Sequence, residues 1–432
     1  MTLHVAGELH ALHSSDSVFP DAFRPWKAQL IRDGVPPVIA VAGSRGKSTV
    51  ANLLELMFAE AGLVCAKRSS RSVTIGGVRQ SDAAAWQRVQ DGQTNSDIAI
   101  DELTWEDTAS LEAGRTLFAV TAVTNICANR EDCLLQGFAR LALASLPRLV
   151  DATAVTGALV LNSEDHSIIG RDLDHGRSTV FVGQDRENPV LQFHLECDGI
   201  GAWRTGDLDA ELRCGMLGRS SSFGKVEDLR FALRGAAAFQ ITNALTAVSV
   251  AASCGVPHDA IRRALRLFAA SHDGQSPVFH SCESHNVRIV IDRPNPSWCL
   301  RQVVRAVRDA NARRVITLAG RLDSVPQDDL PEIGRLLGRL SGVIVVHSAV
   351  VDDIRVRLLR QGVAQNPTPP VIVHRQNEER AMTLALERAR PDDLVFVLAD
   401  DASIVHRVIG ANAGRTEWNS TDPFERLQEA SL

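Results

Sequence analysis

The chain is 432 residues long, 45% of them hydrophobic and 23% charged, with a formal net charge of −6 at pH 7. This length predicts two or three domains with ample apolar core. The acidic balance, with no basic stripe, argues against a nucleic-acid-binding protein. No apolar run approaches the roughly 20 residues that a membrane-spanning helix needs.

Residues 1–36 show no clear strand–helix pattern and end at a Pro-Pro pair, so we expect an extension packed on the first domain. The N-terminus has no Lys or Arg before its short apolar stretch, which argues against a signal peptide. The eight cysteines contain no C-x-x-C pair and are expected to be reduced, mostly buried thiols. These features favour a cytoplasmic protein.

The segment 38–61, VIAVAGSRGKSTVANLLELMFAEA, is the most informative part of the chain. Its apolar run Val38–Val41 predicts a buried strand that ends in a Gly-rich turn. Gly62 suits the position after a helix C-terminus, where a positive φ is common. The apolar residues between the turn and Gly62 follow the period of one helical face, at Val50, Leu53, Leu54, Met57, Phe58 and Ala61.

A Gly-rich loop between a strand and a helix is typical of a phosphate-binding site. The amides of the loop and of the first helical turn point at one place, the helix dipole favours an anion there, and Lys47 adds a full charge. Ser48 is placed to hold Mg²⁺ on the β- and γ-phosphates. We therefore predict that the chain binds ATP with Mg²⁺. The expected nucleotide-binding residues are Gly43, Ser44, Arg45, Gly46, Lys47, Ser48 and Thr49.

The loop has the spacing G-x-x-G-K-S, which is shorter than the common G-x-x-x-x-G-K-[ST]. In the setting VAGSRGKST it resembles the Mur ligase superfamily, whose members carry G-T-x-G-K-[ST] and join a carboxylate to an amine at the expense of ATP. The layout of the chain is nearest to the capsule-type poly-γ-glutamate synthase ligase and is also similar to folylpolyglutamate synthetase. The resemblance implies small-molecule or peptide substrates, one with a carboxylate and one with an amine.

A carboxylate that completes a Mg²⁺ shell should come from the end of a strand next to the loop. The run Asp97–Asp101 predicts such a strand, with Glu102 just past its carboxyl end. The superfamily has a Glu at this place, so the resemblance implies Glu102 as the metal ligand. Asp101 is the alternative ligand, and an ordinary exposed loop acid is the other interpretation of Glu102.

The stretch VTNICANREDCLLQG resembles the superfamily pattern T-N-[IV]-x-x-D-H-L-D. Thr124 and Asn125 match it, and the resemblance implies that Asn125 lies near the substrate. The Asp-His pair of the pattern is Asn129-Arg130 here, and the superfamily's supporting lysine has no counterpart, so a second Mg²⁺ held in the superfamily's manner is not expected. Arg130 can supply a fixed positive charge instead. A site that has lost catalysis is the alternative.

The stretch 180–233 has short strand-like pieces and many turn residues, which predicts a small β subdomain. A helix is expected over Gln240–Cys254, where the sequence is similar to the superfamily's G-x-H-N-x-x-N-A-x-A. The resemblance implies that Gln240 and Asn243, which are spaced to face one ligand, lie near the adenine. Ordinary helix-surface amides are the alternative.

Residues 269–277 read as a polar linker, beyond which strands and helices alternate regularly. This pattern is typical of a parallel sheet with helices on both faces. We therefore predict an α/β chain with a P-loop ATP-binding domain over 37–268 and a Rossmann-like domain over 277–432. The strands expected in the second domain are Val287–Asp292, Arg314–Ala319, Val343–His347, Val371–His374 and Leu394–Ala399.

Two sites in the second domain resemble superfamily segments. Ile291–Pro296 is a shortened version of D-x-A-H-N-P, which implies that Asp292 lies near the ribose. Gly320–Asp323 resembles the N-x-R-x-D-R stretch of the poly-γ-glutamate type. Arg321 is therefore expected to meet a phosphate or a substrate carboxylate, because strand-end residues of α/β domains face ligand crevices. A solvated surface charge is the alternative.

The predicted function is an ATP- and Mg²⁺-dependent amide ligase that joins a carboxylate, of glutamate or a γ-glutamyl chain, to an amine through an acyl phosphate. A folylpolyglutamate-type ligase and a non-catalytic ATP-binding scaffold or regulatory subunit are the alternatives. Partner subunits and a homo-oligomer both stay open. The residues expected to act in catalysis are Lys47, Glu102, Arg130 and Arg321.

Overall fold

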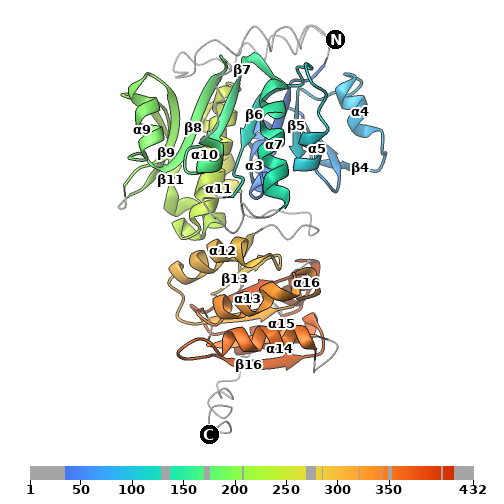
Figure 1. Ribbon diagram of the computed structural model, residues 1–432, viewed down its shortest axis with the longest axis vertical. Helices are drawn as coiled ribbons and strands as arrows, with labels where there is room; N and C mark the ends of the chain where they lie inside the picture. Colours follow the sequence, from blue (N-terminus) through green and yellow to red (C-terminus); the bar gives the residue numbers. More distant parts are fainter. Residues whose placement is uncertain are drawn as a thin grey trace. The chain divides into compact units, whose positions relative to one another are not determined.

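The computed structural model describes residues 35–127, 137–169, 176–206, 209–268, 279–284, 286–320, 322–340, 342–348, 353–399 and 402–412. The chain divides into two compact units, Met1–Phe268 and Ala269–Leu432. Each unit has its own sheet, its own helices and its own hydrophobic core (Figure 1). The predicted α/β class is therefore confirmed. Most of the expected N-terminal extension, 1–36, lies outside the described residues.

The first unit is built on one eleven-stranded sheet. Its strands are β1 (Val38–Ala42), β2 (Cys65–Arg68), β3 (Val73–Ile75), β4 (Val78–Gln80), β5 (Ile98–Leu103), β6 (Phe118–Val123), β7 (Thr153–Asn162), β8 (Ser178–Asp185), β9 (Ile200–Arg204), β10 (Glu211–Met216) and β11 (Arg219–Lys225). Their order is β11-β10-β9-β8-β7-β6-β1-β5-β2-β3-β4. In the sheet order, the strands β9-β8-β7-β6-β1-β5-β2 pair in parallel. Antiparallel pairs complete both edges, with β10 and β11 at one and β3 and β4 at the other.

The small β subdomain predicted over 180–233 is not separate from this sheet. Its strands β8 to β11 extend the main sheet, because β8 pairs in parallel with β7 over Ala158–Asn162. Short strands divided by turns have the same sequence pattern whether they form a sheet of their own or add to an existing edge.

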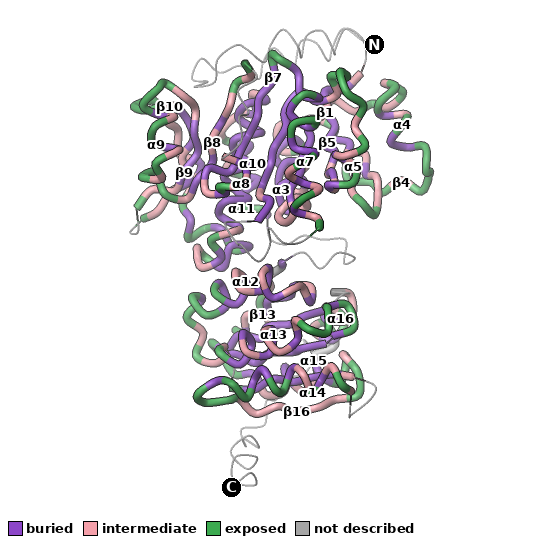
Figure 2. The backbone as a smooth tube through the Cα atoms, viewed as in Figure 1, coloured by how far each residue is buried: buried purple, intermediate pink, exposed green. Residues whose placement is uncertain are grey.

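The central strands of the first unit are buried on both faces, as the purple tube in Figure 2 shows. Helix α3 (Lys47–Glu60) packs against α10 (Ala238–Ser253) and α11 (His258–Leu267). The further helices of this unit are α4 (Ala85–Gln90), α5 (Trp105–Ala109), α7 (Gly137–Asp151), α8 (His166–Ile169) and α9 (Pro189–Glu196), with short 3-10 turns η2 (Val226–Asp228) and η3 (Arg230–Gly235).

The strand, loop and helix predicted over 38–61 are confirmed by β1 and α3. The apolar face of α3 is fully buried, including Leu53 and Phe58. The helix ends before Gly62, whose φ of 79° is the positive value expected after a helix C-terminus.

The second unit has a six-stranded sheet in the order β12-β13-β17-β14-β15-β16. Its strands are β12 (His280–Ser284), β13 (Val287–Asp292), β14 (Val315–Ala319), β15 (Val343–His347), β16 (Val371–Arg375) and β17 (Leu394–Leu398). The five predicted parallel strands are confirmed, and β12 adds an unpredicted antiparallel edge. The connecting elements are α12 (Ser297–Asp309), η4 (Leu322–Ser324), η5 (Gln327–Asp329), α13 (Leu330–Leu337), α14 (Ile354–Val363), α15 (Glu378–Arg388) and α16 (Ala402–Asn412).

Two general expectations from the sequence can be compared with this fold. Among the described residues, no helix is both long enough and apolar enough to cross a membrane. The expectation that all cysteines are reduced is wrong at Cys127, which is disulfide-bonded. The geometric requirement of a disulfide is that the two cysteines lie close in space, at any sequence spacing, so the lack of a C-x-x-C pair does not exclude one.

Candidate functional site

Three segments that are far apart in the sequence meet at one edge of the first sheet. Strand β1 lies between β5 and β6, and Ala42 at its carboxyl end is level with Leu103 and Val123. The loop 43–46, the end of β5 and the turn after β6 therefore lie side by side. This is the edge of an α/β sheet at which ligands characteristically bind.

The loop conformation depends on two glycines. Gly43 and Gly46 have φ values of 143° and 86°. A Cβ atom at Gly43 would lie 2.0 Å from Thr124 Oγ1, and one at Gly46 would lie 2.2 Å from Asn243 Oδ1. Only glycine fits at these two positions, so the loop packs closely against both neighbouring segments.

Lys47 begins helix α3, and its side chain folds back over the loop. The ammonium donates a hydrogen bond from Nζ to Gly43 O at 2.7 Å. Burial lowers the pKa of Lys47, while the carboxylates of Glu102, Glu106 and Asp107 oppose that shift. A buried cation at a helix N-terminus is a favourable partner for an anionic ligand such as a phosphate.

Ser48 and Glu102 are in direct contact. The Ser48 hydroxyl donates to Glu102 Oε1 at 2.6 Å, so the two oxygen groups expected to hold Mg²⁺ are adjacent. Mg²⁺ takes few protein ligands and completes its shell with phosphate oxygens and water. The described residues contain no group of three or more His, Cys, Asp or Glu side chains arranged for a metal. The Ser48–Glu102 pair fits a magnesium ion held mainly by a bound nucleotide.

Glu102 lies inside β5 rather than just past its end, because the strand continues to Leu103. Successive strand residues point to opposite faces, so Asp101 and Glu102 have different surroundings. Asp101 is 3% exposed and forms two hydrogen bonds with Arg68, at 2.6 and 2.9 Å. Burial raises the pKa of Asp101, and the bonds to Arg68 oppose that shift. Asp101 is thus engaged in an ion pair, while Glu102 faces the loop.

The turn after β6 holds the loop from the other side. Thr124 Oγ1 and Asn125 Nδ2 donate to Arg45 O, at 2.5 and 3.0 Å. The amide of Ser44 donates to Asn125 O at 2.9 Å. Asn125, expected near the substrate, therefore contacts the phosphate loop directly.

The segment after β7 holds the turn that follows β6. Asn162 Nδ2 donates to Thr124 O at 2.9 Å. The buried Asp165 carboxylate accepts from the amides of Ile126 and Cys127, at 2.7 and 3.1 Å. The segment 162–165 thus has a structural role. It holds the turn after β6 in place, and that turn holds the phosphate loop.

Gln240 and Asn243 lie on α10 and are 1% and 5% exposed, so the interpretation as helix-surface amides is wrong. Asn243 Nδ2 donates to Gln240 Oε1 at 2.8 Å. Asn243 also lies against Gly46, as the close approach to that glycine shows. The pair is buried beside the phosphate loop.

The structure does not place the other predicted site residues at the loop. Arg130 and Arg321 lie outside the described residues. Asp292 belongs to the second unit, where it ends β13 and is 2% exposed. Its backbone carbonyl accepts from the amide of Ala399 at 2.9 Å.

One contact at the site was not predicted. Trp105 is 5% exposed, and its indole N–H donates to Ser44 Oγ at 3.2 Å. The residues around it form a capping box, in which Thr104 and Asp107 bond to each other's backbone amides. The sequence Thr-Trp-Glu-Asp carries this capping signal, but nothing in it shows that the tryptophan reaches the loop.

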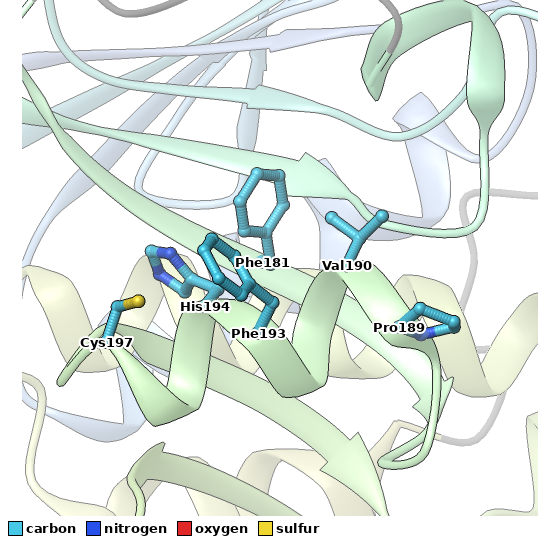
Figure 3. Close-up of a pocket in the computed structure, with 6 residues that line it drawn as sticks. All are labelled: Phe181, Pro189, Val190, Phe193, His194 and Cys197. Atoms are coloured by element: carbon cyan, nitrogen blue, oxygen red, sulfur yellow. The ribbon is translucent and has the colours of Figure 1, made fainter.

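A pocket lies between β8 and α9, and none of the phosphate-loop residues lines it (Figure 3). It has a volume of about 460 Å³. Its lining is mostly apolar, with no lysine or arginine, so it does not suit a phosphate. The lining residues are Phe181, Pro189, Val190, Phe193, His194 and Cys197.

No protein-family model matches the chain. It is similar to the cyanophycin synthetases of Synechocystis sp. (23% identical over 406 residues) and Nostoc sp. (22% over 397). These alignments cover 88% of this chain but 45% and 43% of the two relatives, so the chain spans less than half their length. A UDP-N-acetylmuramoyl-L-alanyl-D-glutamate–2,6-diaminopimelate ligase of Caldanaerobacter subterraneus is 25% identical over 180 residues, 40% of this chain and 35% of that protein.

Solved structures share the fold over most of the chain. Escherichia coli FolC in complex with DHPP and ADP has a TM-score of 0.58 at 15% identity, covering 96% of this chain and 98% of that one. A UDP-N-acetylmuramoyl-L-alanyl-D-glutamate–2,6-diaminopimelate ligase has a TM-score of 0.59 at 15% identity, covering 89% and 81%.

A third structure is a bifunctional folylpolyglutamate synthase/dihydrofolate synthase of Yersinia pestis, complexed with AMPPNP and Mn ion. Its TM-score is 0.57 at 17% identity, and the aligned part covers 95% of this chain and 97% of that one. None of the relatives named here points specifically to the poly-γ-glutamate type. The chain shares its two-unit α/β fold with these solved structures, and its sequence is similar to that of the cyanophycin synthetases over most of its own length.

Proposed function

We propose that the chain is an ATP- and Mg²⁺-dependent ligase that joins a carboxylate to an amine. The observation that carries the proposal is the contact between Ser48 and Glu102, at the start of the helix that Lys47 opens. A hydroxyl, a carboxylate and a buried ammonium are thereby gathered at one helix N-terminus. This arrangement supports binding of Mg·ATP, which the ligase reaction requires.

The chemistry requires two steps, since a carboxylate is a poor electrophile. First, a carboxylate oxygen of the substrate attacks the γ-phosphorus of ATP, and the bond to the ADP oxygen breaks. The amine then attacks the carbonyl carbon of the acyl phosphate, loses a proton, and expels inorganic phosphate. The developing charge in the first step lies on phosphate oxygens, so its stabilisation is chiefly electrostatic.

The residues of this chain have distinct roles in that scheme. Lys47 and the first-turn amides of α3, which have no partner within the helix, bind the phosphates. Ser48 and Glu102 would hold Mg²⁺, which neutralises phosphate charge when it is bound. Gln240 and Asn243 are proposed to lie near the adenine, Asp292 near the ribose, and Asn125 near the substrate. Arg130 and Arg321 remain proposed contacts of the acyl phosphate or of an acidic substrate.

For the substrate we propose glutamate or a γ-glutamyl chain as the source of the carboxylate, in a cytoplasmic reaction. The similarity of Gly320–Asp323 to the poly-γ-glutamate type supports it. A folylpolyglutamate-type ligase is the second candidate. The similarity of fold to E. coli FolC, whose structure is a complex with DHPP and ADP, supports it.

The test is phosphate release from Mg·ATP with paired carboxylates and amines, including glutamate, γ-glutamyl peptides and a pteroate. Hydroxylamine in place of the amine should trap an acyl phosphate as a hydroxamate. Lys47→Ala should abolish release. Lys225→Ala is the matched control, because Lys225 is an exposed lysine paired with Asp209 and Glu227. Tight ATP binding without substrate-stimulated release under any pairing would contradict the ligase and favour the scaffold.

A further inference from the structure

The phosphate loop is attached at two points to one short segment, the end of β5 and the start of α5. Ser48, at the helix end of the loop, bonds to Glu102. Ser44, near the strand end, accepts the indole N–H of Trp105, three residues further along the same segment. The two bonds connect parts of the chain that are 54 and 61 residues apart.

The chemistry of the second bond fixes how the Ser44 hydroxyl is used. An indole N–H can only donate, so Ser44 Oγ must be the acceptor. A serine hydroxyl has one hydrogen of its own, and this bond leaves that hydrogen unused. The backbone amide of Ser44 is engaged separately, by Asn125 O at 2.9 Å. Ser44 is thus held by its backbone on one side and by its side chain on the other.

Trp105 itself is in a fixed position. It is 5% exposed and directly follows Thr104, whose side chain accepts from the amide of Asp107 at 3.1 Å. Asp107 Oδ2 accepts in return from the Thr104 amide at 2.9 Å. Both ends of this turn are therefore hydrogen-bonded, so the backbone that carries the buried indole is held in place beside the loop.

From this geometry we propose that Trp105 is a positioning residue for the nucleotide: its N–H orients the Ser44 hydroxyl so that the hydroxyl hydrogen is donated to a phosphate oxygen. The inference rests on the proposed nucleotide site and adds a residue that neither the loop motif nor the resemblance assigns. Its effect passes through Ser44, and Trp105 does not itself touch the ligand.

The experiment is a double-mutant cycle on Mg·ATP affinity, measured by calorimetry. Trp105→Phe keeps the aromatic packing and removes the N–H, while Ser44→Ala removes the hydroxyl. Each change alone should weaken binding about tenfold, the effect of one hydrogen bond to a charged group. The double variant should be no weaker than either single variant, because both remove the same interaction.

Trp86→Phe is the matched control. Trp86 is also buried, at 6% exposed, and its indole N–H has no hydrogen-bond partner among the described residues. This variant should bind Mg·ATP like the wild type. A change of tryptophan emission on adding Mg·ATP should be present in the wild type and in Trp86→Phe, and absent from Trp105→Phe.

The outcomes separate this inference from the proposed function. If the wild type binds Mg·ATP but Trp105→Phe binds it equally well, the role of Trp105 is overturned and the nucleotide site stands. Independent effects that multiply to about a hundredfold in the double variant would also overturn it, since the two groups would then not act as a unit. Failure of the wild type to bind Mg·ATP would overturn both. Ser44→Ala changes a small loop side chain, so it tests the bond even if Trp105→Phe does not fold.

Discussion

Ser48 donates its hydroxyl hydrogen to Glu102 across 2.6 Å, and this contact joins the first turn of α3 to the neighbouring strand β5. The adjacent residue Asp101 faces the other way and is bound by Arg68. Two consecutive carboxylates thus have different partners. Asp101 is paired with Arg68, a permanent cation, and Glu102 is paired with the neutral hydroxyl of Ser48, which can bind a metal ion together with it.

Exchanging each of these carboxylates for its amide should separate the two roles. We expect wild-type ATP affinity to be higher with Mg²⁺ than with a chelator. Glu102→Gln should lose that difference and reduce phosphate release by about a hundredfold or more, because a neutral amide is a poor magnesium ligand. Calorimetric titration with and without Mg²⁺ measures the first effect. Asp101→Asn is the matched control and should keep the magnesium dependence; loss of the dependence in this variant alone would assign the metal to Asp101.

Lys47 should limit the stability of the ligand-free protein. Burial lowers its pKa from the ordinary value of 10.5, so between the folded-state pKa and 10.5 the unfolded chain binds more protons than the folded one. The free energy of unfolding should therefore rise with pH across that window. The stability gained in this way is lost again as the pH falls through the folded-state pKa of Lys47. Lys47→Met removes the buried charge, so it should flatten this part of the pH profile and be at least as stable as the wild type at neutral pH.

Urea unfolding from neutral to alkaline pH measures this effect, and Lys225→Met is the control. The pKa of Lys225, an exposed lysine, is raised by its bonds to Asp209 and Glu227, so its contribution to the pH dependence of stability has the opposite sign. If Lys47→Met keeps the wild-type pH dependence, burial of the ammonium is not what costs stability.

The sequence predicted the segments whose signal is local. The strand, loop and helix over 38–61 carry a buried run, two glycines and a helical apolar period within 24 residues, and all three elements are confirmed. Glu102 was expected just past a strand and instead lies within it, because strand ends are weakly marked in sequence. That one-residue difference matters, since strand alternation is what separates Glu102 from Asp101.

Contacts that depend on register between distant segments have no local signal in the sequence. The Arg68–Asp101 pair exists because β2 and β5 align these two residues, which are 33 positions apart. The bond from Trp105 to Ser44 depends in the same way on how β5 and β1 align. Hydrophobic period identifies the strands, but their order in the sheet is a property of the whole fold.

The close approach of Gly46 to Asn243 gives a prediction about the loop. In Gly46→Ala the added methyl group would meet Asn243 Oδ1, and the residue would also keep a φ of 86° that alanine tolerates poorly. We expect a loss of about 2–4 kcal/mol in the free energy of unfolding, together with loss of ATP binding. Asn243→Ala in the same chain removes the clashing group.

The double variant should therefore recover part of the stability, while the cost of the positive φ remains. Denaturant unfolding of the two single variants and the double variant measures this coupling. Simple addition of the two single effects would show that Gly46 and Asn243 do not pack against each other.

In the second unit, two helices approach each other through glycine. A Cβ atom at Gly362 of α14 would lie 1.8 Å from Pro331 O, and one at Gly334 of α13 would lie 2.1 Å from Leu359 O. Both obstacles are backbone atoms, which cannot rotate away. Gly362→Ala should therefore force the helices apart and lower the free energy of unfolding by about 1–3 kcal/mol, in spite of the higher helix propensity of alanine.

Gly410→Ala on α16 is the matched control: no heavy atom lies within 4 Å of its added methyl group, so it should stabilise the chain by about 0.5–1 kcal/mol. Thermal unfolding of the two variants should thus show shifts of opposite sign, and equal shifts would mean that the contact between α13 and α14 does not require glycine.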